Sequence, residues 1–173
     1  HNLPFLSNSV FDLCLSKLKN AHFCSMEQLN FPNYAFTLKN RENKTYIVDL
    51  IRKKNLLLTP EEWVRQHCLH FLISELGYPK SLINVEKQIK INGQLKRYDI
   101  VVYSSQGDVH ILVECKAPSI AISQSTFDQI AQYNMTLNSS FLMLSNGKEH
   151  YFCVMDFEKK SYKFIKELPK YKV

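Results

Sequence analysis

The stretch RYDIVVYSSQGDVHILVECKAP, residues 97–118, decides the fold. Two apolar runs flank the turn-forming residues 104–108, a pattern that predicts a β-hairpin with Gly107 at a positive φ. If the loop comprises residues 105–108, Ser104 lies opposite Val109. Every later pair then follows from that first one, so the whole register depends on the loop length.

In this register, Asp99 lies directly opposite Glu114. Because side chains alternate between the faces of a strand, Glu114 and Lys116 share a face, and directly opposed residues share it too. Two carboxylates and one ammonium therefore meet in one patch at the ends of two apolar strands. Opposed like charges destabilise a sheet, and burial adds to the cost. A bound Mg²⁺ would relieve this strain; the alternative is a structural ion-pair cluster that Lys116 alone neutralises.

Length and composition indicate one globular domain. The chain has 173 residues, of which 45% are hydrophobic. We predict an N-terminal extension over residues 1–25 and a single domain over residues 26–173. The net charge of +6 fits an anionic partner such as nucleic acid, with ordinary solubility charge as the alternative.

Cysteine usage points to a reducing, cytoplasmic location. The five cysteines are odd in number, and none has CxxC spacing. No Cys/His cluster has the spacing of a zinc site. No apolar run approaches the length that spans a membrane, so we expect no membrane association.

A helix is predicted from Pro60 to Leu76. Thr59 caps its start and Gly77 ends it. Several of its polar residues are candidates to face an active site, and an ordinary polar face is the simpler alternative for each: Glu62, Gln66 and either His67 or His70.

The remaining pattern predicts alternating strands and one further helix. That helix begins at Ser123 or Ser125 and runs to about Leu137. A small N-terminal hairpin is expected from runs 34–38 and 45–50, followed by a solvated loop at 52–54 that could touch a phosphate. Strands are expected at 82–91, 141–144, 151–155 and 162–165. The fold class is therefore α/β, an α-β-β-β-α-β core whose mixed central sheet is flanked by helices, plus an N-terminal hairpin.

Several short motifs, in order, resemble the PD-(D/E)XK nuclease superfamily, and more closely the N-terminal nuclease domain of type I restriction enzyme R subunits. The resemblance covers roughly residues 34–167, and it implies a restriction-endonuclease-like fold. The motifs are PEEWVRQ (60–66), VE (85–86), KRYD (96–99), LVECKAP (112–118), Gln129…Tyr133 and SNG (145–147).

The resemblance implies a role for each matching residue. Asp99, Glu114 and the backbone carbonyl of Cys115 would hold Mg²⁺ or Mn²⁺, with Glu62 as a further candidate ligand. Lys116 would orient or help deprotonate the attacking water and stabilise charge on the phosphate. Other matching positions would support the site or hold the nucleic-acid backbone: Lys96, Arg97, Gln129 and Tyr133.

The sequence departs from the family at two points. Tyr98 stands where the superfamily has a proline, and the chain shows no phosphate-binding glycine loop of a helicase motor. The expected function is a Mg²⁺-dependent DNA endonuclease, acting alone, as a homodimer or with other restriction subunits. The alternative is a non-cleaving module of a restriction or repair complex that binds nucleic acid or docks onto a partner.

Overall fold

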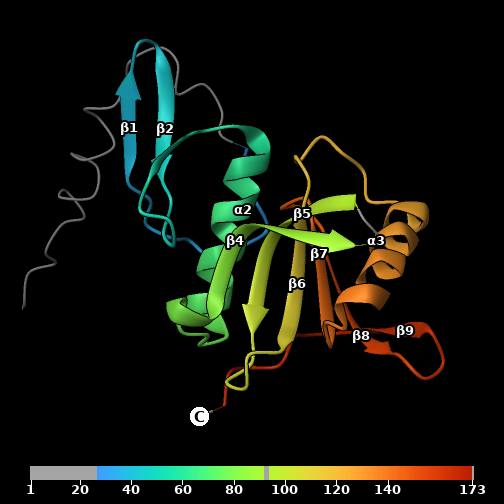
Figure 1. The fold of residues 1–173 in the computed structure, drawn as a ribbon. Coiled ribbons are helices and arrows are strands. Elements are labelled where there is room, and N and C mark those ends of the chain that lie inside the picture. The colour runs from blue at the N-terminus through green and yellow to red at the C-terminus, as the bar shows by residue number, and fades with distance from the viewer. Residues whose placement is uncertain (1–26, 92–93, 173) are drawn as a thin grey trace, which may run out of the picture.

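The computed structural model describes residues 27–91 and 94–172 and arranges them around a six-stranded sheet, with a separate three-stranded sheet before it (Figure 1). A π-helical turn, Phe71–Glu75, follows the first helix directly. The elements in chain order are β1 (Leu38–Arg41), β2 (Lys44–Val48), β3 (Asn55–Leu57), α2 (Pro60–His70), β4 (Ile83–Ile91), β5 (Gln94–Tyr103), β6 (Val109–Cys115), α3 (Gln124–Leu137), β7 (Phe141–Ser145), β8 (His150–Asp156) and β9 (Ser161–Ile165).

The large sheet is mixed because one connection crosses over it. Its strands follow the order β4-β5-β6-β7-β8-β9. Strands β6 and β7 pair in parallel, and the other neighbouring strands pair antiparallel. A parallel pair needs a long crossover, which here contains α3. The order α2, β4, β5, β6, α3, β7 is the α-β-β-β-α-β arrangement, so the predicted fold class is confirmed.

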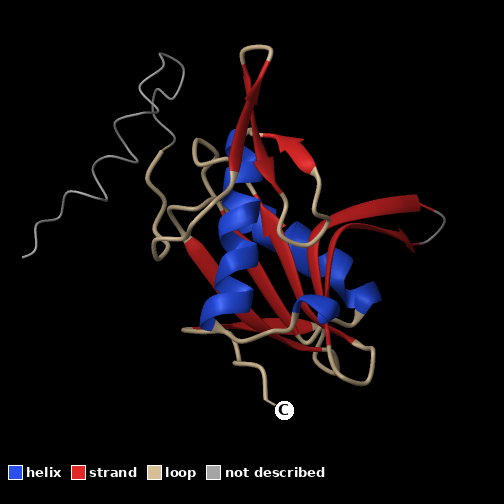
Figure 2. Cartoon of the chain, turned by 90° about the vertical axis from the view of Figure 1, so that its left-hand side faces the viewer, coloured by secondary structure: helices blue, strands red, loops and turns tan. Residues whose placement is uncertain are grey.

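The two helices cover opposite faces of the large sheet. Alternate residues of β5 divide between them: Ile100 and Val102 pack in the same cluster as Val64 of α2, whereas Val101 packs with Phe127 of α3. In Figure 2, α2 lies in front of the strands and α3 behind them. The central strands are therefore buried on both sides, which accounts for their nearly continuous apolar sequence.

The predicted hairpin register holds along most of its length. Ile100 lies opposite Val113, and the pairs after it follow the predicted series as far as Val102. The series then shifts, because a bulge places Tyr103, rather than Ser104, opposite Val109. The predicted pairing of Ser104 was therefore wrong.

Ser104 belongs instead to the turn. Its backbone N–H donates to the carbonyl of Asp108 at 2.8 Å, and its hydroxyl accepts from the backbone N–H groups of Gln106 and Asp108. These turn contacts compete with a regular strand pair and explain the slip.

Both predicted helix starts are confirmed. The Thr59 hydroxyl accepts from the backbone N–H of Glu62 at 3.1 Å, and the Ser123 hydroxyl accepts from that of Thr126 at 3.2 Å. The regular part of α2 ends at His70, earlier than predicted, and the π-helical turn continues the chain to Glu75.

The first strand of the N-terminal hairpin lies further along the chain than predicted, whereas the second begins one residue earlier and ends two residues earlier. Its strands are β1 and β2, joined by a two-residue turn in which Glu42 and Asn43 have φ values of 48° and 60°. Tyr34 and Phe36, predicted as strand residues, pack instead in an aromatic cluster against His70 of α2. The third strand, β3, was not predicted, because three residues carry too little pattern.

The predicted N-terminal extension over residues 1–25 falls outside the described residues. In the part of the chain that is described, no helix is long and apolar enough to cross a membrane.

Gly147 supplies a first testable prediction. Its φ is +85°, and a Cβ there would lie 2.7 Å from Leu29 Cδ2 and 3.1 Å from Val64 Cγ2. We expect Gly147→Ala to lower the free energy of unfolding by about 1–3 kcal/mol, through backbone strain and overpacking. Gly77→Ala is the matched control, because its φ is +79° and a Cβ there would meet no atom within 4 Å. Urea denaturation that ranked Gly77→Ala as the costlier change would contradict the close packing.

Candidate active site

Asp99 lies where β5 and β6 stop pairing. The backbone pairing ends with Ile100 opposite Val113. Beyond this point the backbone N–H of Cys115 donates to Asp99 Oδ2 at 2.7 Å. The buried carboxylate thus takes the place of a backbone acceptor at the opening between the two strands.

Glu114 and Lys116 lie at the same opening. Lys116 Nζ donates to Glu114 Oε1 at 2.9 Å, and their side chains are 30% and 22% exposed. Burial and then the negative charge of Asp99 raise the pKa of Glu114, against the opposing effect of Lys116. Burial alone would lower the pKa of Lys116, but Glu114, with Asp99 and Glu61, raises it. The structure therefore brings the two predicted acids and the lysine together.

Arg65 of α2 reaches into this acidic patch. Its Nη2 donates to Asp99 Oδ1 at 2.8 Å, its Nη1 pairs with Glu62, and its Nη2 lies 3.3 Å from Glu61 Oε1. The side chain is only 5% exposed. Burial alone would lower the pKa of Arg65, yet Asp99 and Glu62 raise it. Arg65 therefore supplies the buried positive charge that neutralises Asp99 from the helix side.

Glu62 belongs to a second, adjoining network. Its Oε1 accepts from Gln66 Nε2 at 2.9 Å, and Gln66 Nε2 also donates to Asp49 Oδ2 at 2.8 Å. Burial raises the pKa of Glu62, although Gln66 and the two arginines, Arg65 and Arg52, oppose the shift. Glu62 and Gln66, candidates to face an active site, are thus buried and bind side chains of this chain.

Arg52 links this network to β4. It pairs with Asp49 at 2.9 Å and with Glu86 at 2.5 Å. Burial alone would raise the pKa of Asp49, but hydrogen bonds from Arg52, with its charge, lower it. Glu86 has a φ of 52°, rare for a residue with a side chain, and interrupts the pairing between Val85 and Lys87. Arg52 is therefore half-buried and ion-paired, so the prediction of a solvated loop fails for this residue.

Gln129 and Tyr133 lie four residues apart on α3. Their side chains lie on one face of the helix, with Gln129 Nε2 3.5 Å from the Tyr133 hydroxyl. Tyr133 and Glu114 both act on Tyr98, because burial, then Glu114, then Tyr133 raise the pKa of Tyr98 to about 12. The Tyr98 hydroxyl is buried and has no hydrogen-bond partner within the described residues. Tyr98 therefore lies between the acidic patch and the predicted helix pair.

Two residues of β5, Lys96 and Arg97, are predicted to contact nucleic acid. Arg97 is 60% exposed, and its guanidinium lies 4.0 Å from Glu86 Oε1. Lys96 lies opposite Ile89 in the pairing with β4, but its side chain falls outside the described part of the structure.

His67 faces away from the acidic patch. Its ring lies in an aromatic cluster, with centroids 4.2 Å from Trp63 and 4.6 Å from Phe36. Burial lowers the pKa of His67 to about 4, so the ring is neutral at physiological pH. His70 stacks on Tyr34 in the same cluster. Both histidines therefore pack in an aromatic cluster, so they fit neither the predicted active-site role nor the alternative of an ordinary polar face.

The oxygen donors at the patch suit Mg²⁺, which takes one or two carboxylates together with water and substrate oxygens. Asp99 and Glu114 supply two carboxylates whose mutual repulsion a cation would relieve. Across residues 27–91 and 94–172, no group of three or more His, Cys, Asp or Glu side chains is arranged to hold a metal ion. Asp99 and Glu114 are therefore the two candidate carboxylate ligands, and Glu62 is engaged by Gln66 and Arg65.

Sequence reasoning missed Arg65, although a signal for it was present. Glu61 and Glu62 precede it by four and three residues, a spacing at which helical ion pairs form. Arg65 also lies beside Val64 in the buried stripe of α2, where an unpaired charge would be costly. Its bond to Asp99 joins residues 34 apart in sequence, which no local pattern reveals.

Comparison with known proteins places the chain in a family. A family model described as the type I restriction enzyme R protein N terminus matches residues 60–169. Among solved structures, a fragment assigned as an HsdR subunit of a type I restriction enzyme from Vibrio vulnificus YJ016 is similar, with 18% sequence identity and a TM-score of 0.48 over 65% of this chain. This chain spans 24% of that one. No curated protein matches. Because the family model covers most of the sequence, the chain belongs to the type I restriction enzyme R protein N-terminal family.

Proposed function

We propose that the chain is a Mg²⁺-dependent DNA endonuclease that hydrolyses phosphodiester bonds, and that its catalytic patch is Asp99, Glu114 and Lys116. The observation that carries the proposal is the meeting of two mutually repelling carboxylates and an ammonium at a strand opening. Membership of a restriction-enzyme subunit family supports a restriction-related nuclease domain.

Each residue of the patch has a distinct task. Asp99, Glu114 and the Cys115 carbonyl would hold Mg²⁺ or Mn²⁺, which when bound supplies Lewis acidity and a more acidic water. The Lys116 ammonium would orient the attacking water and stabilise negative charge on the phosphate. As the water oxygen bonds to phosphorus, the bond to the leaving oxygen breaks, and the proton lost by the water is balanced by one gained at the leaving oxygen.

The other matching residues would hold the substrate. Gln129 and Tyr133 would contact the substrate from α3, and Lys96 and Arg97 would do so from the part of β5 that precedes Asp99. Contacts from such residues to the sugar–phosphate backbone of DNA position the substrate and carry no sequence information directly. DNA, other restriction subunits and a second copy of the chain remain the predicted partners, and a cytoplasmic location and the Glu62 ligand also stay predictions.

A second candidate function has one observation in its favour. Both oxygens of Asp99 are already engaged, one by Arg65 and the other by the Cys115 N–H. A patch satisfied in this way would suit a non-cleaving module that binds nucleic acid or docks onto a partner in a restriction or repair complex.

A plasmid assay separates the two functions. We expect the chain to nick or cut supercoiled DNA with Mg²⁺ or Mn²⁺. EDTA should abolish this cleavage, and the Glu114→Gln variant should lose it. This change keeps the side-chain shape but removes the charge that a metal needs. Salt-sensitive DNA binding without cleavage under either metal would favour the non-cleaving module, and full activity in Glu114→Gln would refute the assigned site.

A further inference from the structure

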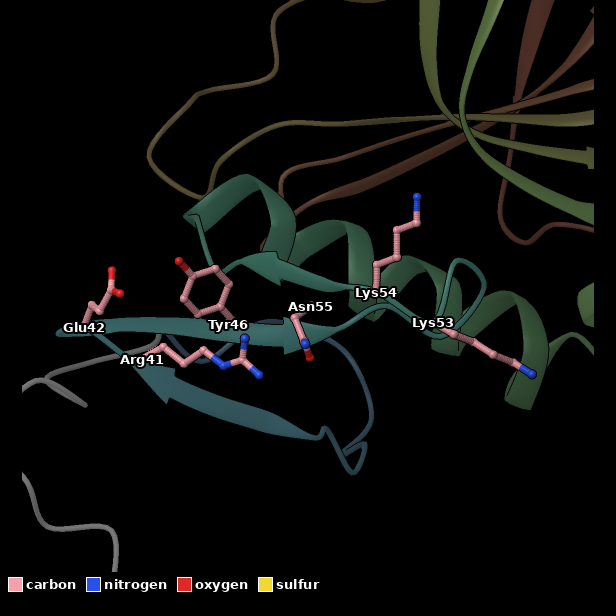
Figure 3. A pocket seen from close by; sticks show the side chains of 6 residues that line it. All are labelled: Arg41, Glu42, Tyr46, Lys53, Lys54 and Asn55. Atoms are coloured by element: carbon pink, nitrogen blue, oxygen red, sulfur yellow. The ribbon is translucent and has the colours of Figure 1, made fainter.

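The three-stranded sheet carries an exposed basic surface that the assigned site does not use. A cavity of about 500 Å³ opens on this sheet. Figure 3 shows its lining spread along β2 and the turns on either side of it. We call the residues that line this cavity the basic sheet surface. They are Arg41, Glu42, Tyr46, Lys53, Lys54 and Asn55.

Positive charge on the basic sheet surface and on the strands beside it is left largely uncompensated. The segment from β1 to β3 exposes five cationic side chains against one exposed acid, Glu42, because Asp49 is buried and paired with Arg52. None of the five forms an ion pair with another described residue. The five are Lys39, Arg41, Lys44, Lys53 and Lys54.

The surface is held firmly to the candidate active site. The turn after β2 is closed by bonds of 2.9 Å from Lys53 N to Asp49 O and from Asp49 N to Lys54 O. Arg52, in the middle of this turn, is bound to Glu86, which also lies 3.6 Å from Arg65. The backbone of Lys53 and Lys54 is therefore linked through Arg52 and Glu86 to the arginine that bonds Asp99.

We propose that the basic sheet surface binds the sugar–phosphate backbone of the DNA that the active site would cut. Clustered, unpaired lysine and arginine side chains gain affinity for DNA by releasing its condensed counterions. The half-buried Tyr46 and the exposed Asn55 add polar groups of the kind that contact phosphates. The surface lies outside the family match at 60–169, so it extends the substrate contact beyond the nuclease core.

This inference rests on the proposed function only for the identity of the substrate. DNA binding is therefore measured in EDTA, where cleavage plays no part. The probe is a labelled DNA duplex of about 25 base pairs, long enough for a footprint of several phosphates.

The test variant is Arg41→Gln/Lys53→Gln/Lys54→Gln. Its matched control is Lys163→Gln/Lys166→Gln/Lys170→Gln, which removes the same charge from exposed positions on and after β9. Figure 1 shows β9 and the β1–β2 hairpin at opposite ends of the molecule.

We expect the test variant to bind the duplex about 10-fold to 100-fold more weakly at low salt, and the slope of log K against log[salt] to become shallower by about 2–3. The control is expected to change affinity by less than about 3-fold, through net charge alone. Equal losses in both variants, or none in either, would overturn the proposal.

Two further outcomes are decisive. If the test variant keeps DNA binding but loses binding to poly-glutamate, the surface takes an acidic protein segment and the proposal falls. If the wild type binds DNA through this surface yet never cleaves with Mg²⁺, the surface stands and the nuclease proposal fails.

Discussion

Replacing Lys116 with methionine is expected to reduce Mg²⁺-dependent cleavage by at least about 100-fold, the range lost when a positioned charge-stabilising donor is removed. Methionine keeps the length of the side chain and loses its ammonium, which now lies 2.9 Å from Glu114 Oε1. Single-turnover cleavage of a plasmid measures the effect. Lys163→Met, an exposed lysine on β9, is the control and should cleave at the wild-type rate.

Metal binding distinguishes a catalytic Lys116 from a structural one. Lys116 is not a proposed ligand, so calorimetric titration with Mn²⁺ should show binding retained in Lys116→Met. Removing a nearby positive charge should, if anything, strengthen it. Cleavage at the wild-type rate in Lys116→Met would contradict the assigned role. If Lys116→Met lost both cleavage and metal binding while keeping its fold, the role of Lys116 would be structural, as the ion-pair partner of Glu114.

Arg65→Ala is expected to lower the free energy of unfolding by about 3–5 kcal/mol, the usual cost of removing one partner from a buried ion pair. The change leaves Asp99 and Glu62 buried, 7% and 6% exposed, without the guanidinium that both now share. Urea denaturation monitored by circular dichroism gives the value directly.

Arg97→Ala is the matched control for Arg65→Ala. Arg97 also approaches Glu86, at 4.0 Å, but it is 60% exposed, so its loss should cost less than about 1 kcal/mol. The double variant Arg65→Met/Asp99→Asn should be less destabilised than the sum of its single changes, because it removes the charges on both partners. Equal losses of unfolding free energy in Arg65→Ala and Arg97→Ala would show that the buried ion pairs stabilise the fold no more than an exposed one.

The strands around the patch could be predicted because their signals are local. The run from Ile100 to Val102 and the run before Glu114 are apolar, and the turn between them contains Gly107. The register survived an error at Ser104, since the bulge falls between Val102 and Tyr103 and affects only the loop side. Asp99 and Glu114 lie just beyond the other end of the paired segment, because the strand pairing stops with Ile100 opposite Val113.

The surroundings of the patch could not be predicted because tertiary contacts create them. The positive φ of Glu86 and its bond to Arg52 depend on the close approach of β4 to the turn after β2. Arg65 was visible only as a helical neighbour of two glutamates, and its bond to Asp99 required the packing of α2 on the sheet. Sequence patterns thus indicated the acids and the lysine but not what balances their charge.

The parallel pairing of β6 with β7 has a consequence for how the chain assembles. Asp99 and Glu114 belong to a hairpin closed by residues 104–108, whereas residues 116–140 separate β6 from β7. Loop-closure entropy rises with the length of chain between contacts, by about 0.6 kcal/mol for each doubling. The two acids therefore share a local element that is cheap to form, while the bond from Lys116 N to Ser145 O belongs to the slower, non-local step. We therefore expect the repulsion between the acids to arise during folding before the framework around the lysine is complete.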